Sequence, residues 1–322
     1  MLRFTENNEV IRDDAYRAIL VGLQTSEDIS YSMEELKGLA EAANVEVLGQ
    51  MIQNLERPNT ATLIGKGKVE ELAEMAQNME ADTVIFNDEL TGMQLRNLED
   101  AVGVRVIDRT ILILDIFAAR ASSREGKLQV ELAQLQYRMP RLTGFGKSLS
   151  RLGGGIGTRG PGEKKLETDR RHIERRMYDI KAELAQLKNT RSVQRARREK
   201  SEIPVVALVG YTNSGKSALM NRILAMTEKE EKTVFEKNML FATLDTQQRS
   251  VVLDTNHQFI LVDTVGFVSK LPHALVDAFK ATLEEVCYAD LLLHVVDSAY
   301  EHSDFHIAVT DKVLNEIGAG HK

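Results

Sequence analysis

An apolar segment that runs into a glycine-containing loop and then into a helical pattern most limits the fold of this chain. The segment, IPVVALVGYTNSGKSALMNRIL, starts at Ile203 and carries Gly210, Gly215, Lys216 and Ser217 at the spacing G-x-x-x-x-G-K-S. In a strand–loop–helix context this is a phosphate-binding P-loop, because the loop amides and the helix N-terminus surround a β-phosphate. The lysine reaches the β and γ oxygens, and the serine hydroxyl binds Mg²⁺. The sequence therefore predicts a nucleotide site in an α/β domain.

Two other segments complete the predicted site. The apolar strand in FILVDTVGF ends in Asp263, a candidate for holding Mg²⁺, and Gly266 follows, with an amide suited to sensing a γ-phosphate. Upstream, FATLDT supplies Thr243 in a stretch weak in regular structure, as a mobile switch requires. We assign catalysis to Lys216, Thr243 and Gly266, and metal binding to Ser217, Thr243 and Asp263. The predicted nucleotide-binding residues are Gly210, Tyr211, Thr212, Asn213, Ser214, Gly215, Lys216, Ser217, Phe241, Thr243, Asp263 and Gly266.

The residue after Gly266 sets an expectation about the rate of hydrolysis. Ras-like switches place a water-orienting glutamine there, whereas this chain has Phe267, which cannot form those hydrogen bonds. Intrinsic hydrolysis should therefore be slow unless a partner or an ion supplies the missing part. Asn213 stands at the P-loop position that resembles the potassium-binding asparagine of GTPases lacking the glutamine, so K⁺ is a candidate cofactor. A structural role in capping the loop is the alternative.

The sequence offers no guanine-selecting segment. No asparagine is followed by lysine, so the Asn-Lys-x-Asp pattern is missing, and the chain ends at Lys322, about where the next strand of such a domain would begin. We therefore expect a shortened P-loop domain. His302 and His306 lie four apart on the last predicted helix. They could share a metal, but without further ligands nearby a solvated helix face is the favoured interpretation.

The first hundred residues alternate strand-like and helix-like segments. YRAILVGL, VEVLGQMI, TVIFND and VRVID have the apolar runs of strands, and helical patterns separate them. This alternation predicts a small parallel sheet flanked by helices. Residues 65–68, GKGK, open one of the helices, where free amides and Lys66 and Lys68 could hold ATP. A simple loop-to-helix turn is the favoured interpretation.

The middle of the chain has a helical period. Leucine and methionine recur every three or four residues from Leu128 to Met139, and the same spacing returns in Leu166, Ile173, Met177, Ile180, Leu184 and Leu187. Two such segments joined by a long loop predict an antiparallel helical hairpin, an arm that projects from the protein. We accordingly divide the chain into an N-terminal α/β domain (1–110), a helical arm (111–200) and a partial P-loop domain (201–322).

The loop between the two arm helices, residues 141–162, holds eight glycines, four basic residues and no acidic residue. Its GIGTRG stretch matches the dinucleotide-binding fingerprint in spelling, but that fingerprint needs a strand before the glycines and a βαβ unit around them. A flexible linker is the other alternative, although linkers favour serine over arginine. Glycine permits close backbone contact, and basic side chains neutralise phosphates, so we predict contact with folded RNA. The predicted RNA-binding residues are Arg141, Lys147, Arg151 and Arg159.

Charge and cysteine content indicate the kind of partner and the cellular compartment to expect. Residues 120–200 hold 21 Lys and Arg against 9 Asp and Glu, a local +12, whereas the whole chain carries −7. This contrast favours a polyanion partner for the middle section. The single cysteine, Cys287, excludes a disulfide framework, and no apolar run is long enough to span a bilayer. We expect a soluble cytoplasmic protein, and a monomer.

Several motifs together resemble one protein family. EGKLQVELAQL, GGGIGTRGPGE, KLETDRR, GYTNSGKS, FATLD, DTVGF and LPHALVDAFKATLEE occur in this order, and with them the chain resembles HflX, a family of ribosome-associated GTPases. The resemblance implies a GTPase that uses GTP/GDP and Mg²⁺, binds the large ribosomal subunit and its rRNA, is stimulated by it, and splits stalled or stress-arrested ribosomes. It also implies that the arm and its loop reach the peptidyl transferase region. The competing hypothesis is an RNA or ribosome binding module that binds nucleotide without efficient turnover.

Overall fold

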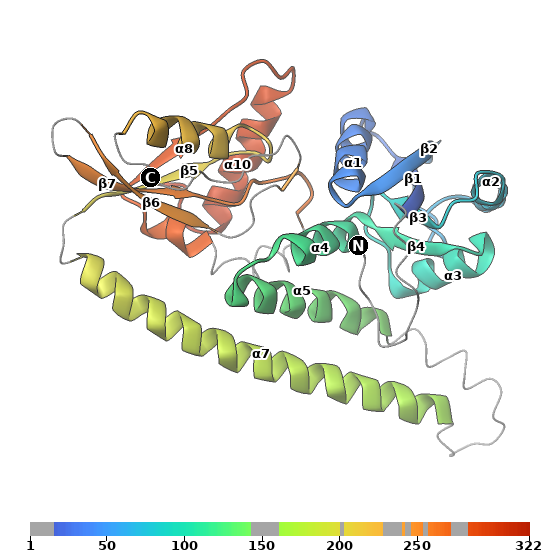
Figure 1. The fold of residues 1–322 in the computed structure, drawn as a ribbon. Helices are drawn as coiled ribbons and strands as arrows, with labels where there is room; N and C mark the ends of the chain where they lie inside the picture. The colour runs from blue at the N-terminus through green and yellow to red at the C-terminus, as the bar shows by residue number, and fades with distance from the viewer. Residues whose placement is uncertain are drawn as a thin grey trace. The chain divides into compact units, whose positions relative to one another are not determined.

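The protein has a mixed α/β fold, as predicted, with two sheets and a long helical section (Figure 1). The structure, a computed structural model, describes residues 16–142, 161–199, 203–227, 240–241, 246–253, 257–271 and 283–322. These form two compact units, one drawn from 1–119 and 134–178 and the other from 120–133 and 179–322. The division runs through both helices of the arm, and the three domains taken from the sequence stay a prediction.

The N-terminal sheet has four parallel strands in the order β2-β1-β3-β4. All four strands and the three helices between them were predicted from the alternation of apolar runs and helical periods. The strands are β1 (Tyr16–Gln24), β2 (Val45–Asn54), β3 (Thr83–Phe86) and β4 (Arg105–Asp108). The helices are α1 (Ser30–Ala42), α2 (Lys66–Asn78) and α3 (Gly92–Val102).

Helices cover both faces of this sheet. Ile19 of β1 belongs to a buried cluster with Leu72 of α2 and Leu98 of α3. Gly22, which follows on the opposite face of β1, lies against Met33 of α1. Successive residues of a strand point to opposite faces, so β1 is buried on both sides and reads as one continuous apolar run.

The helical section comprises α4 (Arg109–Arg120), α5 (Arg124–Leu142) and α7 (Pro161–Glu199). Along the described side chains of α7, the predicted stripe of Ile173, Met177, Ile180, Leu184 and Leu187 is less exposed than most of the residues around it, and Ile180 is fully buried. Arg124 at the start of α5 forms an ion pair with Glu183 in the second half of α7, at 2.7 Å, as an antiparallel pair of helices allows. In the described residues, every helix is too short or too polar to cross a bilayer.

The second sheet has the strand order β6-β7-β5-β8, in which β6 is antiparallel to β7 and the other pairs are parallel. Leu208, Leu261 and Val251 of this sheet form a buried cluster with Met220 and Leu224 of α8. The hairpin partner β6 was not predicted. The strands are β5 (Val205–Val209), β6 (Gln247–Val252), β7 (Gln258–Asp263) and β8 (Leu291–His294), and the helices are α8 (Lys216–Ala225) and α10 (Ser303–Glu316).

Candidate nucleotide-binding site

The predicted P-loop lies between β5 and α8, and two of its positions require glycine. Gly215 precedes α8 with φ of +90°, in the left-handed region that side chains disfavour. A Cβ at Gly210 would lie 2.3 Å from the carbonyl oxygen of Val295, the residue after β8. The N-cap residue of α8 is Gly215, which has no side chain to cap the first amides of the helix. The N-terminus of the helix adjoins the loop, in the arrangement that phosphate binding uses.

Lys216 is buried under the loop. Its Nζ donates to the carbonyl oxygens of Gly210, at 3.2 Å, and Tyr211, at 2.7 Å. Burial lowers the pKa of Lys216 to about 8, and the nearby charge of Asp263 acts in the opposite direction. A bound phosphate would form an ion pair with the ammonium of Lys216 and raise its pKa, because a nearby negative charge favours the protonated form. This side chain is therefore suited to binding a polyanion.

Ser217 and Asp263 meet at the ends of two neighbouring elements. Ser217 Oγ lies 2.6 Å from Asp263 Oδ2, and Asp263 is fully buried as the last residue of β7. A hydroxyl and a carboxylate oxygen are hard ligands of the kind that Mg²⁺ prefers. The two residues thus fit the metal role predicted for them. Thr243, the third predicted metal ligand, lies outside the described residues.

The segment after β7 rests on the P-loop. Tyr211 and Phe267 form a parallel bridge, in which Phe267 N donates to Gly210 O at 3.1 Å and Thr212 N donates to Phe267 O at 2.6 Å. A Cβ at Gly266 would lie 2.5 Å from Thr212 Cα and 3.0 Å from Lys216 Nζ. Gly266 is therefore beside the lysine, as the predicted γ-phosphate sensor should be.

Phe241 contacts the same loop from the other predicted switch. Its amide donates to Thr212 Oγ1 at 2.7 Å, and its side chain is 1% exposed. Phe241 and Asn213 both have left-handed backbones, with φ of +53° and +60°. The structure thus brings Phe241 to the P-loop, although its predicted contact with nucleotide stays a prediction.

Sequence reasoning missed an aromatic stack behind the P-loop. The Tyr211 ring stacks on His306 of α10, with centroids 3.8 Å apart, and Tyr300 stacks on the same imidazole at 5.0 Å. The favoured interpretation of a solvated helix face is wrong for His306, which is 9% exposed. No local pattern in the sequence signals this burial, because it depends on the ring of Tyr211, which is distant in the chain. Within the described ranges, no group of three or more His, Cys, Asp or Glu side chains could hold a metal.

At the start of α2, the structure shows the loop-to-helix turn that was favoured. Gly65 is the N-cap of the helix, and its amide donates to Gln53 Oε1 at 2.8 Å. The ammonium of Lys68 is paired with Glu71 at 2.7 Å. The ATP site suggested at Lys66 and Lys68 stays a prediction.

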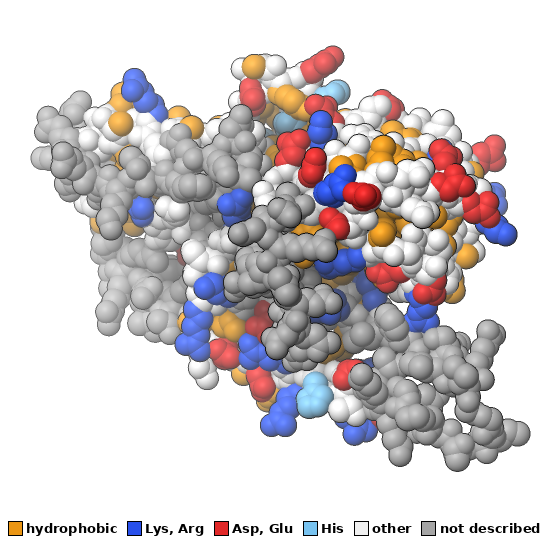
Figure 2. All heavy atoms as spheres, turned by 45° about the vertical axis from the view of Figure 1, so that its right-hand side comes forward, with side chains coloured by type: hydrophobic (Ala, Val, Ile, Leu, Met, Phe, Trp, Pro, Cys, Tyr) orange, Lys and Arg blue, Asp and Glu red, His pale blue; other side chains and the backbone are white. Residues whose placement is uncertain are grey.

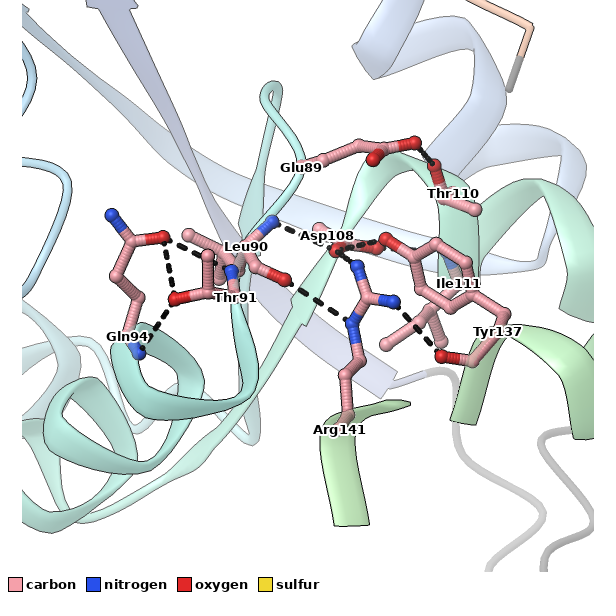
Figure 3. A network of polar contacts seen from close by, with 9 residues as sticks. All are labelled: Glu89, Leu90, Thr91, Gln94, Asp108, Thr110, Ile111, Tyr137 and Arg141. Atoms are coloured by element: carbon pink, nitrogen blue, oxygen red, sulfur yellow. Dashed lines mark hydrogen bonds and ion pairs between the residues drawn. The ribbon is translucent and has the colours of Figure 1, made fainter. Parts of the chain in front are cut away.

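Of the four predicted RNA-binding residues, only Arg141 lies in the described part of the chain. Its guanidinium turns toward the end of β4 rather than outward (Figure 3), with Nε donating to Leu90 O at 3.1 Å and Nη2 lying 3.6 Å from Asp108 Oδ2. Tyr137 donates from its hydroxyl to the same carboxylate oxygen at 2.5 Å. These contacts fix the last turn of α5 to the N-terminal sheet. The RNA contact of Arg141 stays a prediction, and Lys147, Arg151 and Arg159 lie outside the described residues.

The described side chains of α7 carry charges of both signs. From 167 to 188 there are six Lys and Arg and five Asp and Glu, and ion pairs one turn apart join Arg170 to Glu174 and Arg171 to Glu167. Figure 2 likewise shows blue and red side chains interspersed on the face it presents. The positive excess of the middle section therefore comes mainly from residues beyond this stretch.

Three family models match the chain in consecutive order. Their descriptions are GTP-binding GTPase N-terminal for residues 30–118, GTP-binding GTPase Middle Region for 120–198, and 50S ribosome-binding GTPase for 205–319. The last of these covers the P-loop and both segments that rest on it. Sequence matching therefore agrees with the geometry in locating a GTPase site there.

Individual relatives extend over nearly all of the chain. GTPase HflX of Caldanaerobacter subterraneus subsp. tengcongensis is 56% identical over 311 residues, which is 97% of this chain and 71% of that protein. GTPase HflX of Escherichia coli K12 is 44% identical over 308 residues, or 95% and 71%. The crystal structure of the SsGBP and GDP complex has a TM-score of 0.53 and 28% identity, covering 94% of this chain and 79% of that one. With these matches and the P-loop geometry together, the chain belongs to the GTPase HflX family.

Proposed function

We propose that this protein hydrolyses GTP with Mg²⁺ and uses the nucleotide cycle to bind and release the large ribosomal subunit, splitting stalled or stress-arrested ribosomes. The observation that carries the proposal is the contact between Ser217 and Asp263 beside the buried Lys216, at a loop that requires glycine at positions 210 and 215. The SsGBP relative was crystallised as a GDP complex, and one matching family model is described as a 50S ribosome-binding GTPase. We propose a cytoplasmic monomer.

In this proposal each residue acts on the phosphates by position and charge. Lys216 exchanges its two carbonyl partners for β and γ oxygens, and the amides of the loop and of α8 bind the β-phosphate. Ser217, Thr243 and Asp263 would hold Mg²⁺, which neutralises charge that develops between the β and γ phosphates when it is bound. The amide of Gly266 donates to the γ-phosphate.

Hydrolysis by the protein alone should be slow. Phe267 is 1% exposed and offers no side-chain hydrogen bond to orient water. We propose that the large subunit, with K⁺ near Asn213, supplies the missing orientation. The test is the GTP hydrolysis rate of the full chain with and without purified large subunits, in K⁺ and in Na⁺. Equal rates in all four conditions would contradict both the stimulation by the large subunit and the role of K⁺.

The glycine-rich loop is the proposed contact with rRNA. Arg151 and Arg159 are the variants of choice, because Arg141 already serves the contact with Asp108. The double change to alanine should weaken cosedimentation with large subunits and flatten its salt dependence, since each phosphate contact adds to the salt slope. Arg57→Ala, an exposed arginine of the N-terminal domain, is the control. Unchanged binding over several salt concentrations would leave a linker as the better description of the loop.

Phe267 also favours a second candidate function, a ribosome or RNA binding module that binds nucleotide without efficient turnover. The hydrolysis assay and the cosedimentation assay together separate the two candidate functions. If subunits bind the protein in a nucleotide-dependent manner while GTP remains uncleaved over many binding cycles, the second candidate is correct.

A further inference from the structure

Contacts from two segments converge on one P-loop residue, Thr212. One is FATLDT, predicted to be a mobile switch, and the other contains Gly266, predicted to sense the γ-phosphate; we call them the two switch segments. Its hydroxyl oxygen accepts a hydrogen bond from Phe241 N at 2.7 Å, and its backbone amide donates to Phe267 O at 2.6 Å. Thr212 is 5% exposed, and each phenylalanine is 1% exposed. These are buried hydrogen bonds, for which losing one partner is costly.

The contact with Phe267 is part of a close backbone approach. The peptide before it, at Gly266, leaves no room for a Cβ, which would lie 2.5 Å from Thr212 Cα and 2.9 Å from Thr212 N. The Phe267 amide in turn donates to Gly210 O. The glycine expected to sense a γ-phosphate therefore lies directly against Thr212.

The contact with Phe241 holds an unfavourable backbone in place. Phe241 has φ of +53°, a left-handed conformation that bulky residues rarely adopt. Its side chain is nevertheless fully enclosed, and its amide is directed at the Thr212 hydroxyl. Without that acceptor, the buried amide would lose its partner while the backbone kept its strain.

We propose that Thr212 is a positioning residue that links the two switch segments, so that both leave or contact the P-loop together as the nucleotide state changes. This inference rests on the GTP cycle proposed above. A γ-phosphate that binds the Gly266 amide displaces the peptide packed on Thr212, and so disturbs the strand-like contact between the loop and Phe267. Because the hydroxyl of the same residue holds Phe241, a shift of Thr212 reaches both segments.

The test compares Thr212→Val, which keeps the shape and removes the acceptor, with Thr212→Ser, which keeps the hydroxyl. Dissociation constants of the full chain are measured for a fluorescent GDP and a fluorescent non-hydrolysable GTP analogue, together with kcat and KM for GTP. Thr212→Val should raise the affinity for the GTP analogue relative to GDP by about five- to tenfold, because the arrangement that competes with it loses a buried hydrogen bond. The kcat should fall by about tenfold, because the two segments no longer order together. Thr212→Ser should recover most of the change seen in Thr212→Val, because it retains the hydroxyl that accepts from Phe241 N.

A second buried threonine provides the matched control. Thr83 is 2% exposed in β3 of the N-terminal sheet, and its hydroxyl donates to Arg105 O at 3.2 Å. Thr83→Val should lower the melting temperature without changing the ratio of the two affinities. If Thr212→Val does not fold, Thr212→Ala provides the same comparison against Thr212→Ser. If the folded Thr212 variant without the hydroxyl shows an unchanged ratio of GTP-analogue to GDP affinity, Thr212 does not link the two switch segments. If the unchanged protein binds neither nucleotide, the proposed function itself is overturned.

Discussion

Ser217 Oγ and Asp263 Oδ2 lie 2.6 Å apart, although 46 residues separate them in the chain. The contact forms because β5 and β7 are parallel neighbours, with Leu208 opposite Asp263. The P-loop and the end of β7 therefore emerge at the same edge of the sheet. This edge is where ligands bind in open α/β sheets.

Replacing Asp263 by asparagine should remove the dependence of nucleotide binding on Mg²⁺. The amide preserves the size of the buried side chain but lacks the negative charge that a divalent cation requires. We expect GDP affinity in Mg²⁺ to fall by about 10- to 100-fold, the range found when metal sites lose a supporting carboxylate. Titration of a fluorescent GDP with Mg²⁺ and with EDTA measures this. Asp304→Asn, exposed on α10, is the control and should keep the full Mg²⁺ effect.

Adding a single methyl group at Gly266 should impair the GTPase site. The Cβ of Gly266→Ala would overlap Thr212 backbone atoms at 2.5 and 2.9 Å, so the segment must move away from the loop. We expect a loss of about 1–3 kcal/mol in unfolding free energy, as for an overpacked core, and a lower hydrolysis rate. Thermal unfolding and a GTPase assay measure both effects.

The control for this change is Gly67→Ala. A Cβ there meets nothing within 4 Å, and Gly67 lies in the helix α2, where alanine is favoured by roughly 0.5–1 kcal/mol. Equal behaviour of the two alanine variants would show that Gly266 is not tightly packed against Thr212.

Local sequence patterns were sufficient to predict the P-loop with its flanking strand and helix. They were also sufficient for the parallel N-terminal sheet. The strand β6 was missed because QQRSVV has only two apolar residues at its end, and its pairing with β7 supplies the rest. The burial of His306 was missed for a different reason. It depends on a ring from Tyr211, which is 95 residues away in the chain, and no local period reports such a contact.

Arg141 has a structural contact that its sequence context did not indicate. Its place at the edge of a basic glycine-rich loop suggested a phosphate contact, which stays a prediction, and its guanidinium lies 3.6 Å from Asp108, at the end of β4. The carboxylate is fully buried and also accepts from the amides of Leu90 and Ile111, both at 3.0 Å. A buried carboxylate of this kind needs donors and a counter-charge, and Tyr137 and Arg141 supply them (Figure 3).

Removing the Tyr137 hydroxyl should destabilise the attachment of α5 to the N-terminal sheet. Burial and the carboxylate of Asp108 both raise the pKa of Tyr137, so the phenol keeps its proton and donates to Asp108 at neutral pH. Tyr137→Phe should lower the unfolding free energy by about 1.5–3 kcal/mol, as for hydrogen bonds to charged groups. Urea unfolding followed by circular dichroism measures the change. Tyr178→Phe is the control on α7, because Tyr178 is 74% exposed, and a similar loss there would argue against the Asp108 contact.

Asp115 of α4 should make stability fall as the pH rises from about 4 to about 7. It is 8% exposed, and burial raises its pKa to about 7, with Arg105 and Arg138 opposing the shift only in part. Because the folded state binds the proton more tightly than the unfolded state, whose pKa is about 3.9, the contribution is fully present below pH 4 and is lost as the pH passes through 7. At pH 8 the ionised, buried carboxylate therefore costs about 2–4 kcal/mol.

Asp115→Asn removes this titration while keeping the size of the side chain. The variant and the unchanged protein should differ little at pH 4, and the variant should become the more stable of the two as the pH rises to 8. Urea unfolding at half-unit steps of pH gives the difference, in which titrations common to both proteins cancel. Asp100→Asn, exposed on α3, should give a constant offset over the same range. Parallel curves for Asp115→Asn and the unchanged protein would mean that the carboxyl group is already ionised at pH 4, in contact with water or with Arg105 and Arg138.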